Sequence, residues 1–300
     1  MRSVKTYFLA SRPGFFTGVI MPVALGSAYA WHKGVEADYF SFVLALMAAV
    51  LYHAGVNTLN DYSDFKNNSD NINTKRVFPF TGGSRMIQTG KMTPTETLML
   101  SAACFTIGSA IGLYLVYLKG ILLLYIGIFG LLSCIFYNVP PLFLAGRGLG
   151  ELLVGLNFGT LTVAGSYYVQ TSTLSWDVIL VSLPLGFLIT AILYINEFPD
   201  YEADKAAGKR NIVVRMGPEK GRWGFILIIG GAYLSLVLSV ILGYLPLLTL
   251  AALVAAVPAV YAAQGLMRHF SDSMLLRPSL QATIAAHALT GILMTAATFF

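Results

Sequence analysis

The chain has 300 residues, of which 56% are hydrophobic and only 11% charged, and its formal net charge is +5. Soluble globular domains carry about 25% charged residues, so the composition excludes a sizeable soluble domain. The basic residues are spread between apolar runs instead of forming one patch, which argues against nucleic-acid binding. The sequence therefore predicts one domain, residues 1–300, that is all-α and crosses the lipid bilayer several times.

Apolar segments of membrane-spanning length follow one another from end to end. A helix needs about 20 mainly apolar residues to cross the bilayer core, and we expect nine transmembrane helices packed as a bundle. Residues 1–12 predict a short helix at the membrane interface. The nine predicted spans are 14–32, 39–60, 96–117, 120–137, 148–169, 177–197, 223–243, 247–267 and 279–300.

The positions of lysine and arginine predict the orientation of the chain. With a cytoplasmic N-terminus, every basic residue except Lys33 and Lys119 falls on the cytoplasmic side, in agreement with the positive-inside rule. The two long connections, 61–95 and 198–222, lie on that side as well, and the first closes on a predicted capping box that begins at Thr93. We expect an integral protein of the cytoplasmic (inner) membrane whose active site faces the cytoplasm.

The first long connection begins with acidic residues at the end of an apolar run. Asn57, Asp61 and Asp64 are spaced to share one face of a helix, and Asp70 follows among asparagines. Carboxylates in an apolar helix cost about 2.5–3.5 kcal/mol each at mid-membrane and less near its ends, so their presence indicates a use. His53 lies one turn earlier on the same face. It could equally be a polar residue packed inside the bundle, and it is not counted among the predicted site residues.

A second acidic face repeats the first. Asn196, Asp200 and Asp204 end the sixth apolar run, as the first motif ends the second. This offset of four spans predicts a pseudo-repeat of two four-helix halves plus a ninth helix, with a site between the halves. Solvated charges at a helix end would explain any single one of these residues, but the equivalent positions of the two motifs favour a shared site.

The residue types in the two motifs indicate magnesium and phosphate. Half of the 14 acidic residues lie in these motifs, and such crowding of like charge is unfavourable without cations. Oxygen ligands without thiolates favour Mg²⁺ over zinc or copper, whereas arginine and lysine suit phosphate oxygens. We expect a Mg²⁺-bound diphosphate, and the polar and basic candidates around it are Lys66, Arg76, Tyr137, Arg147, Lys209 and Arg210.

These stretches resemble one known family. The similarity is to the UbiA superfamily of intramembrane prenyltransferases, and most of all to its branch that prenylates 1,4-dihydroxy-2-naphthoate for menaquinone. It covers about the first 220 residues and is carried by ASRPGFFTGVIMPVALGSAYAWHKG, NDYSDFKNNSD, TGGSRMIQTGKMTP, GRGLGELLVGLNFGTLTVAGSYYVQ and NEFPDYEADKAAGKRNIVVRMG.

The resemblance implies a fold and a set of site residues. The fold would have nine helices around a lateral, lipid-facing chamber, in which two Mg²⁺ ions bridge a polyprenyl diphosphate. Asp61, Asp64, Asp200 and Asp204 would be catalytic, and Lys209, Arg210 and Arg147 match basic residues of the family. The implied metal ligands are Asn57, Asp61, Asp64, Asp70, Asn196, Asp200 and Asp204, and Asn57 and Asn196 would also contact the substrate.

The expected reaction is prenyl transfer from a polyprenyl diphosphate to an aromatic acceptor. The allylic C–O bond would ionise, the ring would attack, and a motif aspartate could take the ring proton; with 1,4-dihydroxy-2-naphthoate the carboxylate would also be lost. Two departures leave the acceptor open, because Asn68 replaces an acid found in many members and Leu142 stands near the place of a lysine in the menaquinone branch. Alternatives are 4-hydroxybenzoate, homogentisate or an alcohol as acceptor, and a cation-coupled transporter as a different function.

Overall fold

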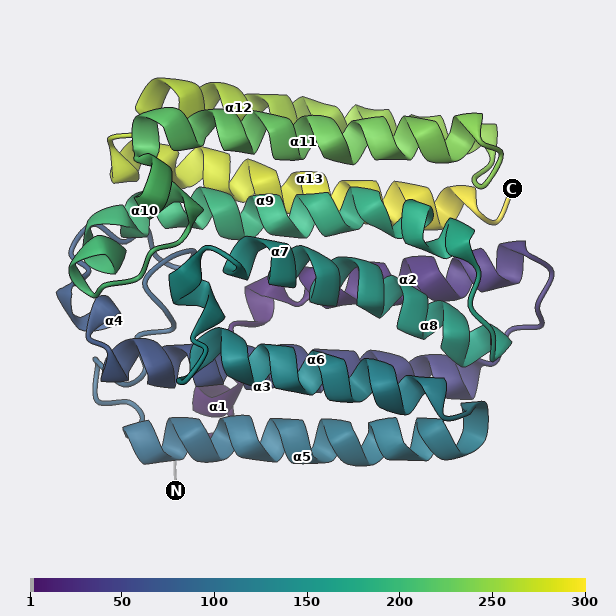
Figure 1. The fold of residues 1–300 in the computed structure, drawn as a ribbon, viewed down its shortest axis with the longest axis horizontal. Helices are drawn as coiled ribbons and strands as arrows, with labels where there is room; N and C mark the ends of the chain where they lie inside the picture. The colour runs from purple at the N-terminus through teal and green to yellow at the C-terminus, as the bar shows by residue number, and fades with distance from the viewer. Residues whose placement is uncertain (1–2) are drawn as a thin grey trace.

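The computed structural model describes residues 3–300, and every regular element in them is helical (Figure 1). The all-α prediction is therefore confirmed. The longer α-helices are α2 (Thr17–His32), α3 (Tyr39–Lys66), α5 (Pro94–Lys119), α6 (Leu122–Asn138), α8 (Thr162–Thr171), α9 (Trp176–Ala206), α11 (Pro218–Ile241), α12 (Ala256–His269) and α13 (Arg277–Ala297). Shorter elements are α1 (Val4–Ala10), α4 (Ser69–Ile72), α7 (Gly150–Val154), α10 (Ile212–Met216), the 3-10 segments Pro13–Phe15, Leu144–Arg147, Leu247–Ala255 and Ser273–Leu276, and the π-helix Gly155–Leu161.

The helices identify an integral membrane protein. Within residues 3–300, eight helical segments are long and apolar enough to cross a bilayer, and α6, with 17 residues, fills the remaining predicted range 120–137. The count of nine spans and the pseudo-repeat of two halves stay predictions. Helices α3 and α9 continue past their predicted ends, to Lys66 and Ala206, so both acidic motifs lie on helices. Helix α1 falls within the range expected for an interfacial helix, whose first two residues lie outside the described part.

Helix α9 forms the centre of the packing. It contributes Leu188 to a hydrophobic cluster shared with α11, α12 and α13, in which Phe225 is fully buried. On another face it contributes Leu185 to a cluster shared with α2 and α8 that contains Leu25. Helices α5 and α6 contribute to neither cluster and pack on α3 at the opposite edge of the bundle (Figure 1). The α3–α5–α6 layer therefore lies outside both of the clusters centred on α9.

The fifth span is not a continuous α-helix. Its π-helical segment, Gly155–Leu161, brings Gly159 directly onto Gly186 of α9, where a Cβ would overlap the backbone. π-helical turns often occur at functional sites. Here the segment carries Asn157 and Phe158, which line the cavities of the bundle.

The two ends of the bundle differ in their polar contents. The acidic ends of α3 and α9 lie at the same end, together with α4 and α10 (Figure 1). The loop that follows α4 ends in the predicted capping box, in which the side chain of Thr93 accepts from the Glu96 N–H and the carboxylate of Glu96 accepts from the Thr93 N–H. Both long connections therefore meet at one end of the molecule.

Candidate active site

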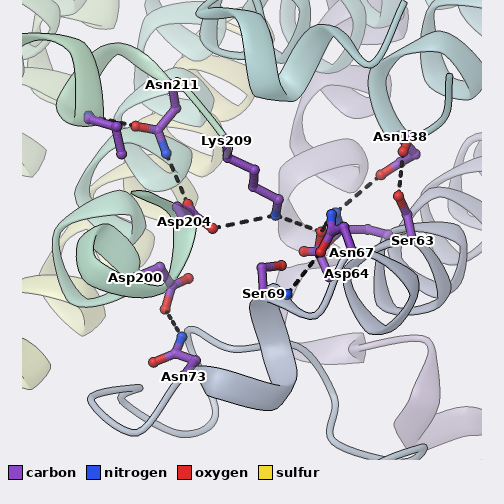
Figure 2. A network of polar contacts seen from close by, with 12 residues as sticks. Ser63, Asp64, Asn67, Ser69, Asn73, Asn138, Asp200, Asp204, Lys209 and Asn211 are labelled. Carbon is purple, nitrogen blue, oxygen red and sulfur yellow. Dashed lines mark hydrogen bonds and ion pairs between the residues drawn. The ribbon is translucent and has the colours of Figure 1, made fainter. Parts of the chain in front are cut away.

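A buried lysine joins the two acidic motifs. Lys209 Nζ lies 2.6 Å from Asp64 Oδ1 on α3 and 3.5 Å from Asp204 Oδ1 on α9 (Figure 2). The side chain of Lys209 is only 10% exposed. Because one ammonium group contacts carboxylates of both motifs, the ends of α3 and α9 converge on a common space.

Amide side chains hold the second motif in place. Asn73 Nδ2, which follows α4, donates a hydrogen bond of 2.6 Å to Asp200 Oδ1. Asn211 Nδ2, just before α10, donates one of 3.0 Å to Asp204 Oδ2. Figure 2 shows these two bonds on either side of the end of α9. Each connecting loop is therefore tied to the acidic helix that it passes.

A glycine lets the loop after α4 pass between two aspartates of the first motif. Gly83 has a φ of +72°, and a Cβ at this position would overlap Asp70 Oδ2 and stand 2.9 Å from Asp61 Oδ1. The next N–H, that of Ser84, donates to both carboxylate oxygens of Asp61 at 3.1 and 3.2 Å. Only glycine combines this left-handed backbone with so close an approach.

These groups surround a buried polar chamber of about 100 Å³. Burial, together with the nearby carboxylates of Asp64 and Asp61, raises the pKa of Asp70 to about 8. Burial opposes the charge of Lys209, but the carboxylates of Asp204 and Asp64 outweigh this effect and hold its pKa above the ordinary value. The walls of the chamber include Arg12, Asn60, Asp64, Asp70, Asn73, Tyr137, Asn196, Asp200, Asp204 and Lys209.

The donor set of the chamber fits a divalent cation. Within residues 3–300, Lys209 is the basic side chain that forms ion pairs with the motif aspartates. Even with Arg12 counted, the carboxylates in the wall of the chamber outnumber its basic side chains. Hard carboxylate oxygens of this kind suit Mg²⁺. No three acidic, histidine or cysteine side chains in this part of the chain are gathered at metal-binding distances.

The predicted site residues divide into two groups, apart from Asn57, which lines the neighbouring cavity that also contains His53. Asp64, Asp70, Tyr137, Asn196, Asp200, Asp204 and Lys209 line the chamber, and Asp61 lies directly behind Gly83. By contrast, Lys66, Arg147 and Arg210 are exposed and do not line it, and Arg76 packs against the neighbouring Gly82. A role of these four basic residues in substrate binding stays a prediction.

Arg12 joins the site although its sequence context predicted only an interfacial helix. It has a left-handed φ of 57°, its guanidinium lies 4.9 Å from the Phe15 ring centroid, and it donates a 3.1 Å hydrogen bond to the carbonyl of Phe80. No spacing relative to the acidic motifs could have indicated this, because Arg12 precedes the first predicted span. The one indication in the sequence of a special role for Arg12 was the dipeptide Arg12-Pro13, in which a charged residue stands directly before a helix-breaking proline.

Three cavities follow one another through the bundle. The polar chamber is followed by a middle cavity of about 130 Å³ and then by an apolar groove of about 380 Å³. The groove is lined by apolar residues of α2, α3, α5, α6 and α8, such as Ala48, Leu115, Leu124 and Val169. The polar chamber and the middle cavity share Arg12, Asn60, Tyr137, Leu193 and Asn196. The middle cavity and the groove share Cys134, Asn157 and Phe158.

Comparison with known proteins identifies the family. The family model of UbiA prenyltransferases matches residues 19–277. The chain belongs to the UbiA prenyltransferase family. It is therefore a prenyltransferase by family, as the sequence motifs predict.

Several curated relatives of this UbiA chain carry related names. The 1,4-dihydroxy-2-naphthoate octaprenyltransferase of Escherichia coli (strain K12) is 29% identical over 94% of this chain and 91% of its own length. The protein of the same name from Bacillus subtilis (strain 168) is 30% identical over 69% of this chain and 64% of its own length. The 2-carboxy-1,4-naphthoquinone phytyltransferase of Synechocystis is 29% identical over 88% of this chain and 82% of its own length.

Solved structures show the same fold. A UbiA homologue from Archaeoglobus fulgidus bound to GPP and Mg²⁺ has a TM-score of 0.67 and 15% identity, with 98% of each chain covered. A structure of digeranylgeranylglyceryl phosphate synthase has a TM-score of 0.65 and 19% identity over 98% of each chain. At these identities the likeness establishes the UbiA fold of this chain and nothing finer.

Proposed function

We propose that this UbiA enzyme transfers a prenyl group from a polyprenyl diphosphate to an aromatic acceptor at the cytoplasmic face of the inner membrane. The observation that carries the proposal is the succession of a buried acidic chamber, a middle cavity and an apolar groove, each of which shares wall residues with the next. A prenyl diphosphate has the same two parts, a highly charged head and an apolar tail. Because two of the relatives are named 1,4-dihydroxy-2-naphthoate octaprenyltransferase, 1,4-dihydroxy-2-naphthoate is the first acceptor to test.

Mg²⁺ is the proposed cofactor. The related Archaeoglobus fulgidus protein is described with GPP and Mg²⁺, and the excess of carboxylates in the polar chamber supports the same ion here. When bound, Mg²⁺ supplies positive charge to the diphosphate leaving group. The residues proposed to hold it are Asn57, Asp61, Asp64, Asp70, Asn196, Asp200 and Asp204.

The residues of the chain would orient the diphosphate and exclude water. Lys209, fixed between Asp64 and Asp204, is placed to donate to diphosphate oxygens. The prenyl tail would lie in the apolar groove, which places its allylic carbon near the middle cavity. When the allylic C–O bond breaks, its electron pair leaves with the diphosphate, and the apolar walls shield the cation from water.

The acceptor ring completes the transfer. Its electron-rich carbon forms the new C–C bond with the allylic carbon, and the proton of that ring carbon passes to a base, for which we propose a motif aspartate. If the acceptor is 1,4-dihydroxy-2-naphthoate, the ring carboxylate leaves as CO₂. Tyr137 lines both the polar chamber and the middle cavity, so it stands beside the point where the cation forms.

The transporter alternative is less favoured by the position of the acids. Transporter substrate sites lie near the bilayer midplane, between broken helices. The aspartates of the two motifs lie instead at one end of the bundle, at the ends of α3 and α9 (Figure 1).

The proposal is tested with purified protein, Mg²⁺ and a labelled polyprenyl diphosphate. The acceptors are 1,4-dihydroxy-2-naphthoate, 4-hydroxybenzoate, homogentisate and an alcohol, and we expect an extractable prenylated product with the first. Asp61→Ala and Asp200→Ala should abolish turnover while the protein still elutes as folded protein from a sizing column. No product with any acceptor, or turnover at wild-type rates in both variants, would refute the proposal.

A further inference from the structure

The middle cavity contains several polar side chains, and most of them are already engaged. Asn57 Nδ2 donates to the carbonyl of Ser11 at 3.0 Å, and Asn157 Nδ2 donates to the carbonyl of Leu153 at 2.8 Å. Asn60 Nδ2 donates at 3.1 Å to an asparagine at the end of α6. These hydrogen bonds fix the orientation of the three amide groups in the wall of the cavity.

His53 differs from these asparagines. It lines the middle cavity and is only 6% exposed, yet its Nδ1 has no hydrogen-bond partner among residues 3–300. The centroid of its ring lies 4.8 Å from that of Phe158 and 5.9 Å from that of Phe16. A buried polar group without a partner costs about 1–3 kcal/mol, so His53, unlike a histidine away from any cavity, stands where a bound ligand could supply the missing hydrogen bond.

The place of the cavity restricts what that ligand can be. The cavity shares Asn196 and Tyr137 with the polar chamber, and Asn157 and Phe158 with the apolar groove. With the diphosphate in the chamber and the prenyl tail in the groove, the allylic end of the donor would lie at the middle cavity, so the acceptor must reach the same cavity. The wall of this cavity includes the rings of Tyr137 and Phe158, against which a flat aromatic acceptor would pack, and its hydroxyl would need a hydrogen-bond partner there.

We propose that a ring nitrogen of His53 hydrogen-bonds the phenolic hydroxyl of the aromatic acceptor and so selects hydroxylated rings. This inference rests on the proposed function and adds the residue that recognises the acceptor. The hydrogen bond orients the ring toward the allylic carbon, and its loss leaves a buried hydroxyl unpaired. Acceptors that lack the hydroxyl proton, such as methyl ethers, are therefore rejected by the wild-type protein.

The test compares three histidine variants in the prenyl-transfer assay. His53→Phe keeps an aromatic ring between Phe16 and Phe158 and removes both nitrogens, whereas His53→Gln keeps a hydrogen-bonding group. His287→Phe is the matched control, because His287 is also fully buried and neither of its ring nitrogens has a partner in residues 3–300, but it lies outside the three cavities.

We expect His53→Phe to lower kcat/KM for the hydroxylated acceptor about 10- to 100-fold, with KM for the prenyl diphosphate changed less than about threefold. The wild-type preference for the free hydroxyl over its methyl ether should largely disappear in His53→Phe and persist in His53→Gln and His287→Phe.

Two results would overturn the inference. One is an unchanged hydroxyl-to-ether preference in His53→Phe, and the other is an equal loss of that preference in His287→Phe. If His53→Phe does not fold, the same preference is measured in His53→Gln, where a complete loss counts against the proposal. Failure of the proposed function itself is distinct, because the wild-type protein would then form no prenylated product.

Discussion

Replacing Lys209 by methionine should make the folded protein depend on Mg²⁺. The ammonium group lies 2.6 Å from Asp64 and 3.5 Å from Asp204, and its side chain is 10% exposed. Removing one partner of a buried ion pair costs about 3–5 kcal/mol, because the remaining charge is left uncompensated. Methionine has a similar length, so the change removes the charge with little loss of volume.

Mg²⁺ should offset much of this loss, because it would neutralise the same carboxylates. A ligand that binds the folded state alone contributes about 2.7 kcal/mol at 100 times its Kd. We therefore expect Lys209→Met to melt roughly 10 °C below the wild-type protein in EDTA. The difference should become clearly smaller at saturating Mg²⁺, even though catalysis remains impaired.

The assay is thermal unfolding in detergent, followed by tryptophan fluorescence in EDTA and along a Mg²⁺ titration. Lys205→Met is the matched control, since Lys205 is exposed on α9 and only stacks on the Tyr201 ring at 5.6 Å. A Lys209→Met protein that melts with the wild type in EDTA would refute the buried ion-pair argument. If Mg²⁺ raises the Tm of Lys209→Met no more than it raises the Tm of the wild type, the proposal that Lys209 and Mg²⁺ neutralise the same carboxylates is refuted.

Two further substitutions test the supports of the chamber. Gly83→Ala should lower the apparent affinity for Mg²⁺, measured from the Mg²⁺-dependent stabilisation, by at least about tenfold, because the new Cβ overlaps Asp70 and crowds Asp61. Gly90, which has a φ of +68° and open space around it, provides the control, and Gly90→Ala should leave the Mg²⁺ titration unchanged. Equal effects of the two substitutions would contradict the steric argument. Glu151→Ala should lower Tm by several degrees, because Glu151 Oε1 accepts a 2.6 Å hydrogen bond from the Ile212 N–H at the start of α10. Glu151→Gln keeps a hydrogen-bond acceptor and should retain most of the stability. Equal losses of Tm in the two variants, measured by differential scanning calorimetry, would count against a stabilising role of this hydrogen bond.

The sequence predicted the helices well because their determinants are local. A run of about 20 apolar residues predicts each span, and the capping box of Thr93 and Glu96 predicts the start of α5. It was less successful where α3 and α9 end, because polar residues there are stabilised by partners from other elements, such as Asn73 and Lys209. The π-helix at Gly155–Leu161 was not predicted, since it depends on the contact of Gly159 with Gly186 of another helix.

The sequence predicted the acidic residues of the candidate site but not the basic residues that lie beside them. Periodicity places Asp61 and Asp64 on one helix face, and the equivalent position of Asp200 indicates a second face of the same kind. Among the basic candidates, periodicity could not distinguish Lys209, which is buried between carboxylates, from Arg147 and Arg210, which are exposed. A loop can follow many paths, so the residues next to a lysine in the sequence do not predict whether that lysine is buried.

The sequence by itself determined that this is an integral membrane protein of helices with two acidic motifs, because hydrophobicity, charge distribution and helical spacing are properties of short segments. Only the tertiary structure decided which groups meet. It brought Lys209 between α3 and α9 and placed Arg12 in the chamber. It also left Nδ1 of His53 without a partner among residues 3–300, in the wall of a cavity that adjoins both the polar chamber and the apolar groove. These juxtapositions depend on how long helices pack against one another, and packing is decided by contacts between residues that are far apart in the chain.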